Sequence, residues 1–130
     1  MISDPTCVLD ASALLAVMQR EVGADAVEDH VPRACISAVN LSEVVAKMRE
    51  RDWTAQHTDD AIAALHLDVR KFGEAEAMRA GHLRLPTRRF GLSLGDRACL
   101  ALASALSLPV LTTDRAWTKL DIGVEVKLVR

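Results

Sequence analysis

The sequence predicts a single α/β domain, a three-layer α/β/α sandwich around a central, mostly parallel sheet. Short apolar runs that are typical of buried strands alternate with longer segments of helical spacing, and this alternation is typical of parallel strands joined by crossover helices. Half of the 130 residues are hydrophobic, which is enough for one sizeable core. No repeat, low-complexity segment or linker divides the chain, so residues 1–130 are expected to form one domain.

Helix-breaking residues and changes in apolar spacing set the boundaries of the predicted elements. Gly23 and Pro32 end two successive N-terminal helices, because glycine favours a helix end and proline cannot continue a helix. Charged residues in the segment 67–72 suggest either an edge strand or a frayed strand end. The predicted elements are a lead over 1–6, strands over 7–9, 34–37, 67–72, 110–112 and 124–129, helices over 11–22, 24–31, 38–51, 54–65, 74–83 and 97–108, a basic loop over 86–91, and a helical turn over 117–120.

The segment 93–114 is the most informative stretch. Its middle part, residues 97–108, is too long for a strand and is apolar on nearly every face, which predicts a helix that is buried on most sides. Pro109 ends this helix, and a short buried strand follows. Asp96 precedes the apolar part in the first helical turn, and Asp114 comes just after the strand. The segment therefore places two carboxylates at the ends of buried elements.

Four acidic residues are predicted to meet at one edge of the sheet. Asp10 follows the first strand, Glu43 lies on the helix after the second strand, and Asp96 and Asp114 join them. The carboxyl ends of parallel strands share one edge with the helix N-termini that follow, and ligands bind there. Clustered carboxylates repel each other unless their pKa values rise or a cation lies among them. Because Mg²⁺ binds a few carboxylates and keeps several waters, the pattern favours a magnesium site.

Each acid also has an ordinary structural explanation. Asp10 and Asp114 can cap the helices that they precede. Asp96 stands three residues after Ser93, which is the spacing of a capping box. Glu43 stands four residues before a lysine, which is the spacing of a surface ion pair. Capping does not explain Glu43, which lies inside its predicted helix, and the spacing by itself leaves both interpretations open.

At these acids the sequence resembles the four blocks of PIN domains, and above all those of the VapC-type toxins of bacterial toxin–antitoxin pairs. The blocks occur in family order and span nearly the whole chain. They are VLDASALLA at 8–16, SAVNLSEV at 37–44, LGDRACLALA at 94–103 and LTTDRAW at 111–117. The resemblance implies a PIN-like α/β/α sandwich and a Mg²⁺- or Mn²⁺-dependent ribonuclease that a cognate VapB-type antitoxin restrains. It also implies that Asp10 and Asp96 are metal ligands and that Glu43 and Asp114 complete the acidic site.

The resemblance leaves several residue roles open. Some relatives carry a further acid after the fourth block, where this chain has Arg115 and Ala116, so the number of metals, one or two, is undetermined. Ser12 and Thr113 match polar family positions and either orient ligands or water, or serve as local hydrogen-bonding groups.

Basic residues in the second half of the chain form a candidate substrate-binding set. They either guide an RNA backbone towards the metal or are simply solvated. The set comprises Arg84, Arg88, Arg89, Arg97 and Arg115.

The amphipathic helices raise the question of a protein partner. The apolar face of residues 11–18 and the helices after Glu43 either pack into the core or exceed what one core can bury. In the second case the surplus forms a homodimer seam or an antitoxin groove, and a homodimer is expected.

Composition narrows the function classes further. The formal net charge is -2, so any nucleic-acid contact must be local or mediated by a metal ion. With 3% aromatic residues, base stacking contributes little and RNA shape should decide the substrate. The three cysteines lie inside apolar runs, as expected for reduced, buried thiols of a cytoplasmic protein. No apolar run is long enough to span a membrane, so no membrane contact is expected.

Three rival functions are compared with the nuclease. A catalytically silent PIN-like binding module fits the same sequence and is distinguished by failing to bind Mn²⁺. A phospho-acceptor receiver domain needs paired acids after the first strand, but Asp10 has no acidic neighbour. A phosphatase of the haloacid-dehalogenase type needs Asp-x-Asp at this place, and position 12 is Ser12.

Overall fold

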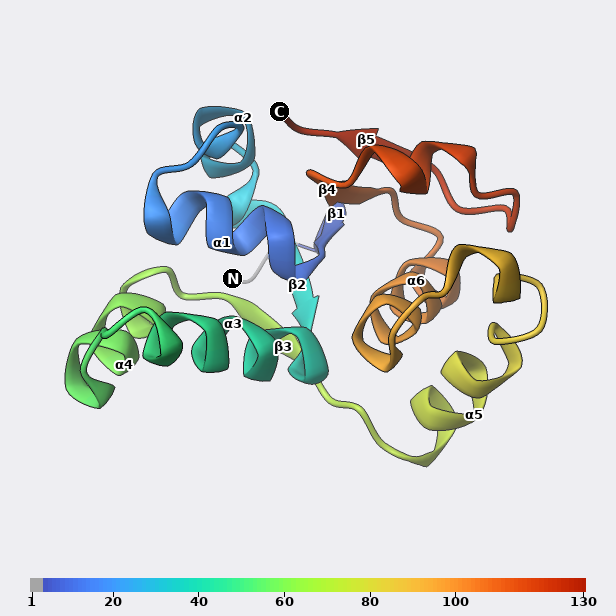
Figure 1. The fold of residues 1–130 in the computed structure, drawn as a ribbon, viewed down its shortest axis with the longest axis horizontal. Helices are drawn as coiled ribbons and strands as arrows, with labels where there is room; N and C mark the ends of the chain where they lie inside the picture. Colours follow the sequence, from blue (N-terminus) through green and yellow to red (C-terminus); the bar gives the residue numbers. More distant parts are fainter. Residues whose placement is uncertain (1–3) are drawn as a thin grey trace.

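The computed structural model describes residues 4–130, so the predicted lead over 1–6 lies partly outside the described residues. The described strands are β1 (Cys7–Leu9), β2 (Ala34–Ser37), β3 (Asp68–Arg70), β4 (Val110–Thr112) and β5 (Val126–Leu128). They form one parallel sheet in the order β3-β2-β1-β4-β5 (Figure 1). The predicted parallel α/β fold is confirmed, and the charged segment does form an edge strand. The three central strands are buried on both faces, as their apolar sequences require.

Helices cover both faces of this sheet. The helices are α1 (Ala11–Gln19), α2 (Ala24–Glu28), α3 (Ala38–Glu50), α4 (Ala55–Ala64), α5 (Glu74–His82) and α6 (Leu94–Leu106), with 3-10 turns η1 (Val31–Arg33), η2 (Arg88–Phe90) and η3 (Arg115–Lys119). Figure 1 shows α1 to α4 on one side of the strands and α5 and α6 on the other. This arrangement is the predicted three-layer sandwich.

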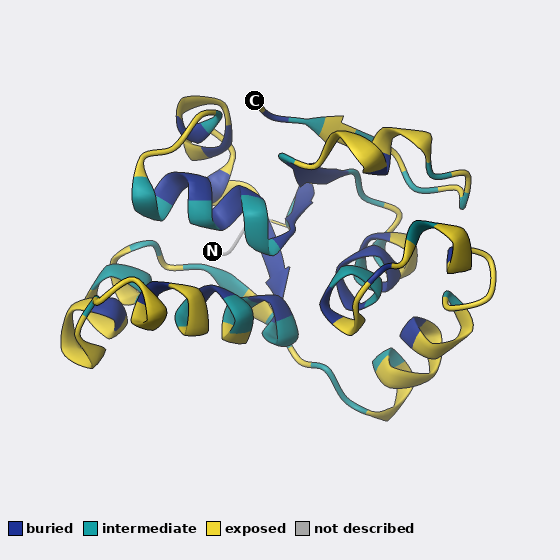
Figure 2. Cartoon of the chain, in the orientation of Figure 1, coloured by how far each residue is buried: buried dark blue, intermediate teal, exposed yellow. Residues whose placement is uncertain are grey.

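Two apolar clusters, one on each face of the sheet, form the core (Figure 2). Along β1, Leu9 faces the cluster under α1 and α3, whereas Val8 faces the cluster under α6. Leu14 of α1 is fully buried in the first cluster, so ordinary core packing accounts for the apolar face of this helix. Within the predicted buried helix over 97–108, residues 98–101 and 103 are buried, whereas Ser104 and Ala105 are exposed, so the prediction holds for its first part and not for its last turn.

Helix boundaries differ from the predicted ones where residues other than glycine and proline act as caps. The first helix ends at Gln19, three residues earlier than predicted, because Arg20 adopts a left-handed cap conformation with φ 54°. Pro32 lies inside the turn η1 and does not directly end α2. The buried helix begins three residues earlier than predicted, because Ser93 caps it. The left-handed backbone of Arg20 and the side-chain cap of Ser93 therefore decide where these two helices end and begin.

Gly23 connects the N-terminal helices to the end of the chain. Its φ is +96°, which side chains rarely tolerate, and a Cβ atom there would lie 2.1 Å from the carbonyl oxygen of Val129. The turn between α1 and α2 therefore packs directly on the segment after β5, and Figure 1 shows the C-terminus beside α2. Only a glycine permits both the turn and this close approach.

The strand order fixes where a ligand site can form. Successive crossovers lead from β1 towards β3 on one side and from β4 towards β5 on the other, so the order reverses between β1 and β4. Ligands of open parallel sheets bind outside the carboxyl ends of the strands at such a point. Asp10 follows β1 and Asp114 follows β4 at this point.

Two further predictions concern the state of the cysteines and the presence of membrane-spanning helices. Cys7, Cys35 and Cys99 are buried, unpaired thiols, as predicted. Within the described part of the chain, no helix combines the length and the apolar character needed to cross a bilayer.

Candidate metal centre

Asp10 is the most buried of the four predicted acids, with 5% of its surface exposed. Its Oδ1 accepts hydrogen bonds from the backbone N–H of Ala13 at 2.8 Å and from the hydroxyl of Ser12 at 2.7 Å. The first of these bonds makes Asp10 the N-cap of α1, so the predicted capping role of Asp10 is confirmed. Its own backbone N–H donates to the carbonyl of Leu111 at 3.2 Å. Strand pairing and helix capping together fix this carboxylate at the edge of the sheet.

A pair of hydroxyl groups joins Asp10 to the loop after β4. The hydroxyl of Thr112 donates to Oδ2 of Asp10 at 2.5 Å, and its oxygen accepts from the backbone N–H of Asp114 at 3.0 Å. The hydroxyl oxygen of Ser12 accepts from the backbone N–H of Thr113 at 3.0 Å. Both oxygens of Asp10 thus accept hydroxyl protons, which orients the carboxylate.

Asp96 lies in the first turn of α6 and is half-buried. Its Oδ2 accepts from the backbone N–H of Ser93 at 3.0 Å, and the Ser93 hydroxyl accepts from the backbone N–H of Asp96 at 3.1 Å. The predicted capping box is therefore present. The negative charge of Asp96 also contributes to raising the pKa of Asp10, so the two carboxylates lie within electrostatic range of each other.

Glu43 reaches this edge from α3 and lies against α6. A Cβ atom built on Gly95 would lie 2.2 Å from Oε1, 2.4 Å from Oε2 and 2.4 Å from Cδ of Glu43. Asn40, one turn earlier on α3, donates from Nδ2 to Oε1 of Glu43 at 2.9 Å and to the carbonyl oxygen of Gly95 at 2.9 Å. The ion pair of Glu43 with Lys47 that the spacing suggested is not among the ion pairs of the described residues.

The pKa values of two buried groups at this edge, Asp10 and Cys99, respond to the charges of neighbouring acids. Burial raises the pKa of Asp10 to about 6, against the lowering effect of its hydrogen bonds. Burial also raises the pKa of the Cys99 thiol, and the charges of Asp10, Asp96 and Glu43 add to that effect. These three acids therefore all lie within electrostatic range of one buried thiol. We call Asp10, Glu43 and Asp96 the acid cluster.

Asp114 follows β4 by two residues, directly before the turn η3. Its side chain is exposed, and Oδ1 accepts from the backbone N–H of Ala116 at 2.9 Å, which caps the turn η3. The link between Asp114 and Asp10 runs through the hydroxyl of Thr112. Thr112 thus links the side chain of Asp10 to the backbone of Asp114, whereas Glu43 and Asp96 have separate hydrogen-bond partners, Asn40 and Ser93.

The donor set of the acid cluster fits a hard divalent cation. All donors are carboxylate oxygens, and none of the ion pairs between described residues involves Asp10, Glu43, Asp96 or Asp114. A buried carboxylate without a cationic partner is unfavourable in its charged form, as the raised pKa of Asp10 records. Among the described residues, no three acidic, histidine or cysteine side chains are placed to hold one ion together. The fit to a hard cation therefore rests on the chemistry of the donors alone, since Mg²⁺ takes oxygen ligands.

The predicted substrate-binding arginines have different environments. Arg88 and Arg89 are exposed on η2, with the Arg89 guanidinium 5.1 Å from the centre of the Phe90 ring, and Arg115 is exposed next to Asp114. Arg97 differs, because it is half-buried and its Nη1 donates to the carbonyl oxygen of Ala80 at 3.0 Å. That bond ties α6 to α5 and gives Arg97 a packing role that the sequence analysis did not foresee.

Three residues of this edge were missed by the sequence analysis. Thr112, and not Thr113, supplies the side chain that contacts Asp10. Asn40 occupies the first position of the buried stripe that continues at Val44 and Met48, so a polar residue in an apolar stripe was the available signal. Gly95, in the first turn of an otherwise apolar helix, was a second such signal.

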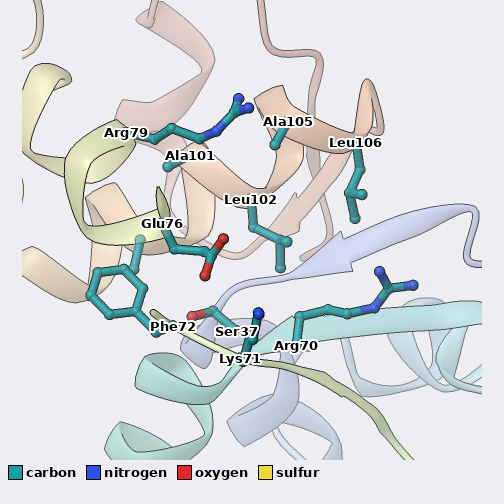
Figure 3. A pocket seen from close by; sticks show the side chains of 11 residues that line it. Ser37, Arg70, Lys71, Phe72, Glu76, Arg79, Ala101, Leu102, Ala105 and Leu106 are labelled. Atoms are coloured by element: carbon teal, nitrogen blue, oxygen red, sulfur yellow. The ribbon is translucent and has the colours of Figure 1, made fainter. Parts of the chain in front are cut away.

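A separate cavity of about 230 Å³ lies between α5, α6 and the carboxyl ends of β2 and β3 (Figure 3). Its apolar wall comes from α6, including Leu102 and Leu106, and Lys71, Glu76 and Arg79 add charged groups. None of the four predicted acids is among its lining residues. The cavity is therefore distinct from the acid cluster.

Comparisons with known structures show the same fold. The chain is similar to VapBC2 from Rickettsia felis, bound to a DNA fragment from its promoter, with 14% identity, a TM-score of 0.73 and coverage of 93% of this chain and 96% of that one. It is similar to a toxin–antitoxin complex from Klebsiella pneumoniae, with 22% identity, a TM-score of 0.72 and coverage of 95% and 98%. It is also similar to VapBC-5 from Mycobacterium tuberculosis, with 22% identity, a TM-score of 0.61 and coverage of 97% and 99%. No curated protein matches the chain at a significant level.

The family comparison rests on sequence and covers almost the whole domain. The model of the PIN domain matches residues 7–123, which include both strands at the switch point and all four predicted acids. The chain belongs to the PIN domain family.

Proposed function

We propose that the protein is a metal-dependent endoribonuclease and the VapC-type toxin of a type II toxin–antitoxin pair. The observation that carries this proposal is the acid cluster, in which a buried Asp10 carboxylate lies within electrostatic range of Asp96, both acids and Glu43 act on the same buried thiol, and no cationic side chain is paired to them among the described residues. Such a cluster is unfavourable unless a cation binds it. The membership in the PIN domain family supports the same reaction class.

The acids and hydroxyls have separate roles in this proposal. Asp10 and Asp96 would hold a Mg²⁺ or Mn²⁺ ion directly, and Glu43 and Asp114 would complete the acidic site. When bound, the ion supplies water activation and neutralises charge on the phosphate that is being cleaved. Ser12 and Thr112 keep the Asp10 carboxylate oriented by donating their hydroxyl protons to it. No side chain is required to form a covalent bond with the RNA.

The exposed arginines are the proposed contacts to the RNA backbone. Arg115 follows Asp114 directly, and Arg88 and Arg89 precede the helix that carries Asp96. Guanidinium groups bind phosphate oxygens and position a strand without reading its sequence. With a net charge of -2, these few residues must supply the local attraction that the whole chain lacks.

A VapB-type antitoxin is the proposed protein partner. The similar structures are VapBC and other toxin–antitoxin complexes, which supports a partner of that kind. We place the protein in the cytoplasm, where its RNA substrate is found, and formation of a homodimer stays a prediction.

The proposed function predicts cleavage of structured RNA that depends on a divalent cation. Purified protein should cut a structured RNA in Mg²⁺ or Mn²⁺, lose this activity in EDTA, and regain it when Mn²⁺ is restored in excess. Cleavage is measured by gel electrophoresis of end-labelled RNA, and Mn²⁺ binding by isothermal titration calorimetry. Cleavage that persists in EDTA contradicts metal dependence. Absence of both Mn²⁺ binding and cleavage instead supports the catalytically silent binding module.

The hydroxyl of Thr112 provides a second test that leaves every acid in place. Thr112→Val keeps the shape of the side chain but removes the 2.5 Å hydrogen bond to Asp10 and the acceptor for the N–H of Asp114. Loss of a group that orients a metal ligand typically costs 10- to 100-fold, so we expect Mn²⁺ affinity and cleavage to fall by roughly that factor. Thr113→Val is the matched control, because that residue contributes its backbone N–H to Ser12. Equal losses in both variants would contradict the role of Thr112.

A further inference from the structure

The contact between Glu43 and Gly95 depends on the absence of a side chain at Gly95. Both carboxylate oxygens and Cδ of Glu43 lie 2.2–2.4 Å from the point where a Cβ would stand. Because these three atoms are nearly equally distant from that point, the carboxyl group lies flat across the glycine. Real Cβ atoms do not approach other atoms so closely, so any larger residue would move the carboxylate. Gly95 is itself buried in the first turn of α6, one residue before Asp96.

Asn40 fixes the other side of the same carboxylate. One N–H of its amide donates to Oε1 of Glu43, and the other donates to the carbonyl oxygen of Gly95, each at 2.9 Å. Both partners are acceptors only, so the amide nitrogen must face them, and the orientation of the side chain follows from chemistry. A single amide group therefore orients the carboxylate of Glu43 and links α3 to α6.

Asn40 and Gly95 each lower the stability of the fold at their positions. Their presence there therefore argues for a function other than stability. Asn40 is 1% exposed, and its Oδ1 is buried with no hydrogen-bond partner. Gly95 stands in a helix, where an alanine would be the better helix former. A domain selected for stability alone would place an apolar side chain at position 40 and alanine at position 95. Both departures instead serve one carboxylate, that of Glu43.

We propose that Asn40 and Gly95 are positioning residues that hold the Glu43 carboxylate against the N-terminal turn of α6, the turn that carries Asp96. This inference rests on the proposed function, because it assigns Glu43 to the metal centre. Neither residue touches the ion or the RNA. Gly95 provides the space for the carboxylate, and Asn40 directs it into that space.

The test compares two glycine-to-alanine substitutions in helices. Gly95→Ala introduces the colliding methyl group, whereas a Cβ at Gly81 of α5 meets no atom within 4 Å, so Gly81→Ala is the matched control. We expect Gly95→Ala to weaken Mn²⁺ binding roughly tenfold and to slow cleavage by about 10- to 100-fold. Gly81→Ala should change neither quantity. Mn²⁺ affinity is measured by calorimetry without RNA, and circular dichroism confirms that both variants fold.

A second pair of variants tests Asn40 independently. Asn40→Leu removes both N–H donors together with the unpartnered Oδ1, so the fold should be retained while Mn²⁺ affinity falls about tenfold. Thr58→Val is the control, since Thr58 is also fully buried and its hydroxyl donates to the carbonyl oxygen of Thr54, the N-cap of α4, and not to an acid. Its Mn²⁺ affinity should equal that of the unmodified protein.

A double-mutant cycle separates positioning from a general structural effect. If Gly95 acts through Glu43, adding Gly95→Ala to Glu43→Ala should change Mn²⁺ affinity less than about twofold, because the displaced carboxylate is already absent. A loss that persists in the Glu43→Ala background, or equal affinities in Gly95→Ala and Gly81→Ala, overturns the inference while leaving the nuclease proposal standing. If the unmodified protein neither binds Mn²⁺ nor cleaves RNA, the proposed function fails, and this inference fails with it.

Discussion

Asp10→Asn is expected to abolish RNA cleavage and, in the absence of metal, to stabilise the protein at neutral pH. Stabilisation of a phosphoryl transition state by a metal is worth several kcal/mol, so losing a ligand should slow cleavage by roughly 1000-fold or more. Burial raises the pKa of Asp10 to about 6 from an ordinary value of 3.8, so the ionised form destabilises the metal-free fold by about 2–3 kcal/mol. An asparagine carries no charge to bury, although its single acceptor oxygen satisfies fewer donors.

The pH dependence of this stabilisation has a definite sign. The folded protein holds the Asp10 proton more tightly than the unfolded chain does, so the destabilising effect is absent below pH 3.8, grows between pH 3.8 and 6, and is complete above pH 6. In EDTA, the melting temperature of Asp10→Asn should therefore exceed that of the unmodified protein by several degrees above pH 6 and converge with it near pH 4. Excess Mn²⁺ should raise the melting temperature of the unmodified protein alone.

The matched control for this substitution is Asp59→Asn, which neutralises an exposed acid on α4. It should change neither cleavage nor the response of the melting temperature to Mn²⁺. Equal cleavage by Asp10→Asn and the unmodified protein would end the assignment of the acid cluster as the catalytic centre. If Asp10→Asn and the unmodified protein have the same metal-free free energy of unfolding at pH 8, the Asp10 carboxylate does not destabilise the fold as a buried, unpaired charge.

Asp96→Asn should lose metal binding while keeping the helix cap, which separates the two explanations of this acid. Its Oδ2 accepts the backbone N–H of Ser93, and the amide oxygen of an asparagine can accept the same bond. We therefore expect the melting temperature without metal to change by a few degrees at most. Cleavage should fall by about 100-fold or more, because the cluster loses a charge that the divalent ion requires.

Ser93→Ala is the complementary variant for Asp96. It removes the other half of the capping box, the hydroxyl that accepts the N–H of Asp96, and should cost about 1 kcal/mol of stability with little change in Mn²⁺ affinity. Thermal unfolding in EDTA and calorimetry with Mn²⁺ measure the two effects separately. If Asp96→Asn cleaves RNA as fast as the unmodified protein, the negative charge of Asp96 is not needed for cleavage. In that case the side chain serves only as a helix cap.

The sheet and the placement of the acids were predictable because they depend on short apolar runs and on chain order. Runs such as Cys7–Leu9 and Val110–Thr112 are too short and too apolar for any element but a buried strand, and parallel pairing brings the residues after them to one edge. Capping was also visible in the spacing of Ser93 and Asp96, and the structure contains that capping box. Capping and metal binding are compatible, because a carboxylate has two oxygens with several lone pairs.

The remaining features depend on contacts between segments that are far apart in the chain. Thr112 contacts Asp10 across 102 residues, and only the pairing of β1 with β4 makes them neighbours. Asn40 and Gly95 meet only because α3 and α6 approach each other at the carboxyl edge of the sheet. The early end of α1 at Arg20 reflects a left-handed cap by a residue other than glycine, which local propensity disfavours. The packing of Arg97 on Ala80 likewise required the position of α5.

The approach of Gly23 to Val129 has a consequence for how the domain folds. A turn near the beginning of the chain rests on the carbonyl of a residue more than a hundred positions later, so it gains its native support only after the last strand has docked. Contacts of such long sequence separation slow folding, because the chain must close a large loop before the contact forms. During synthesis on the ribosome, the turn between the first two helices therefore gains this contact only after the segment that follows β5 has emerged.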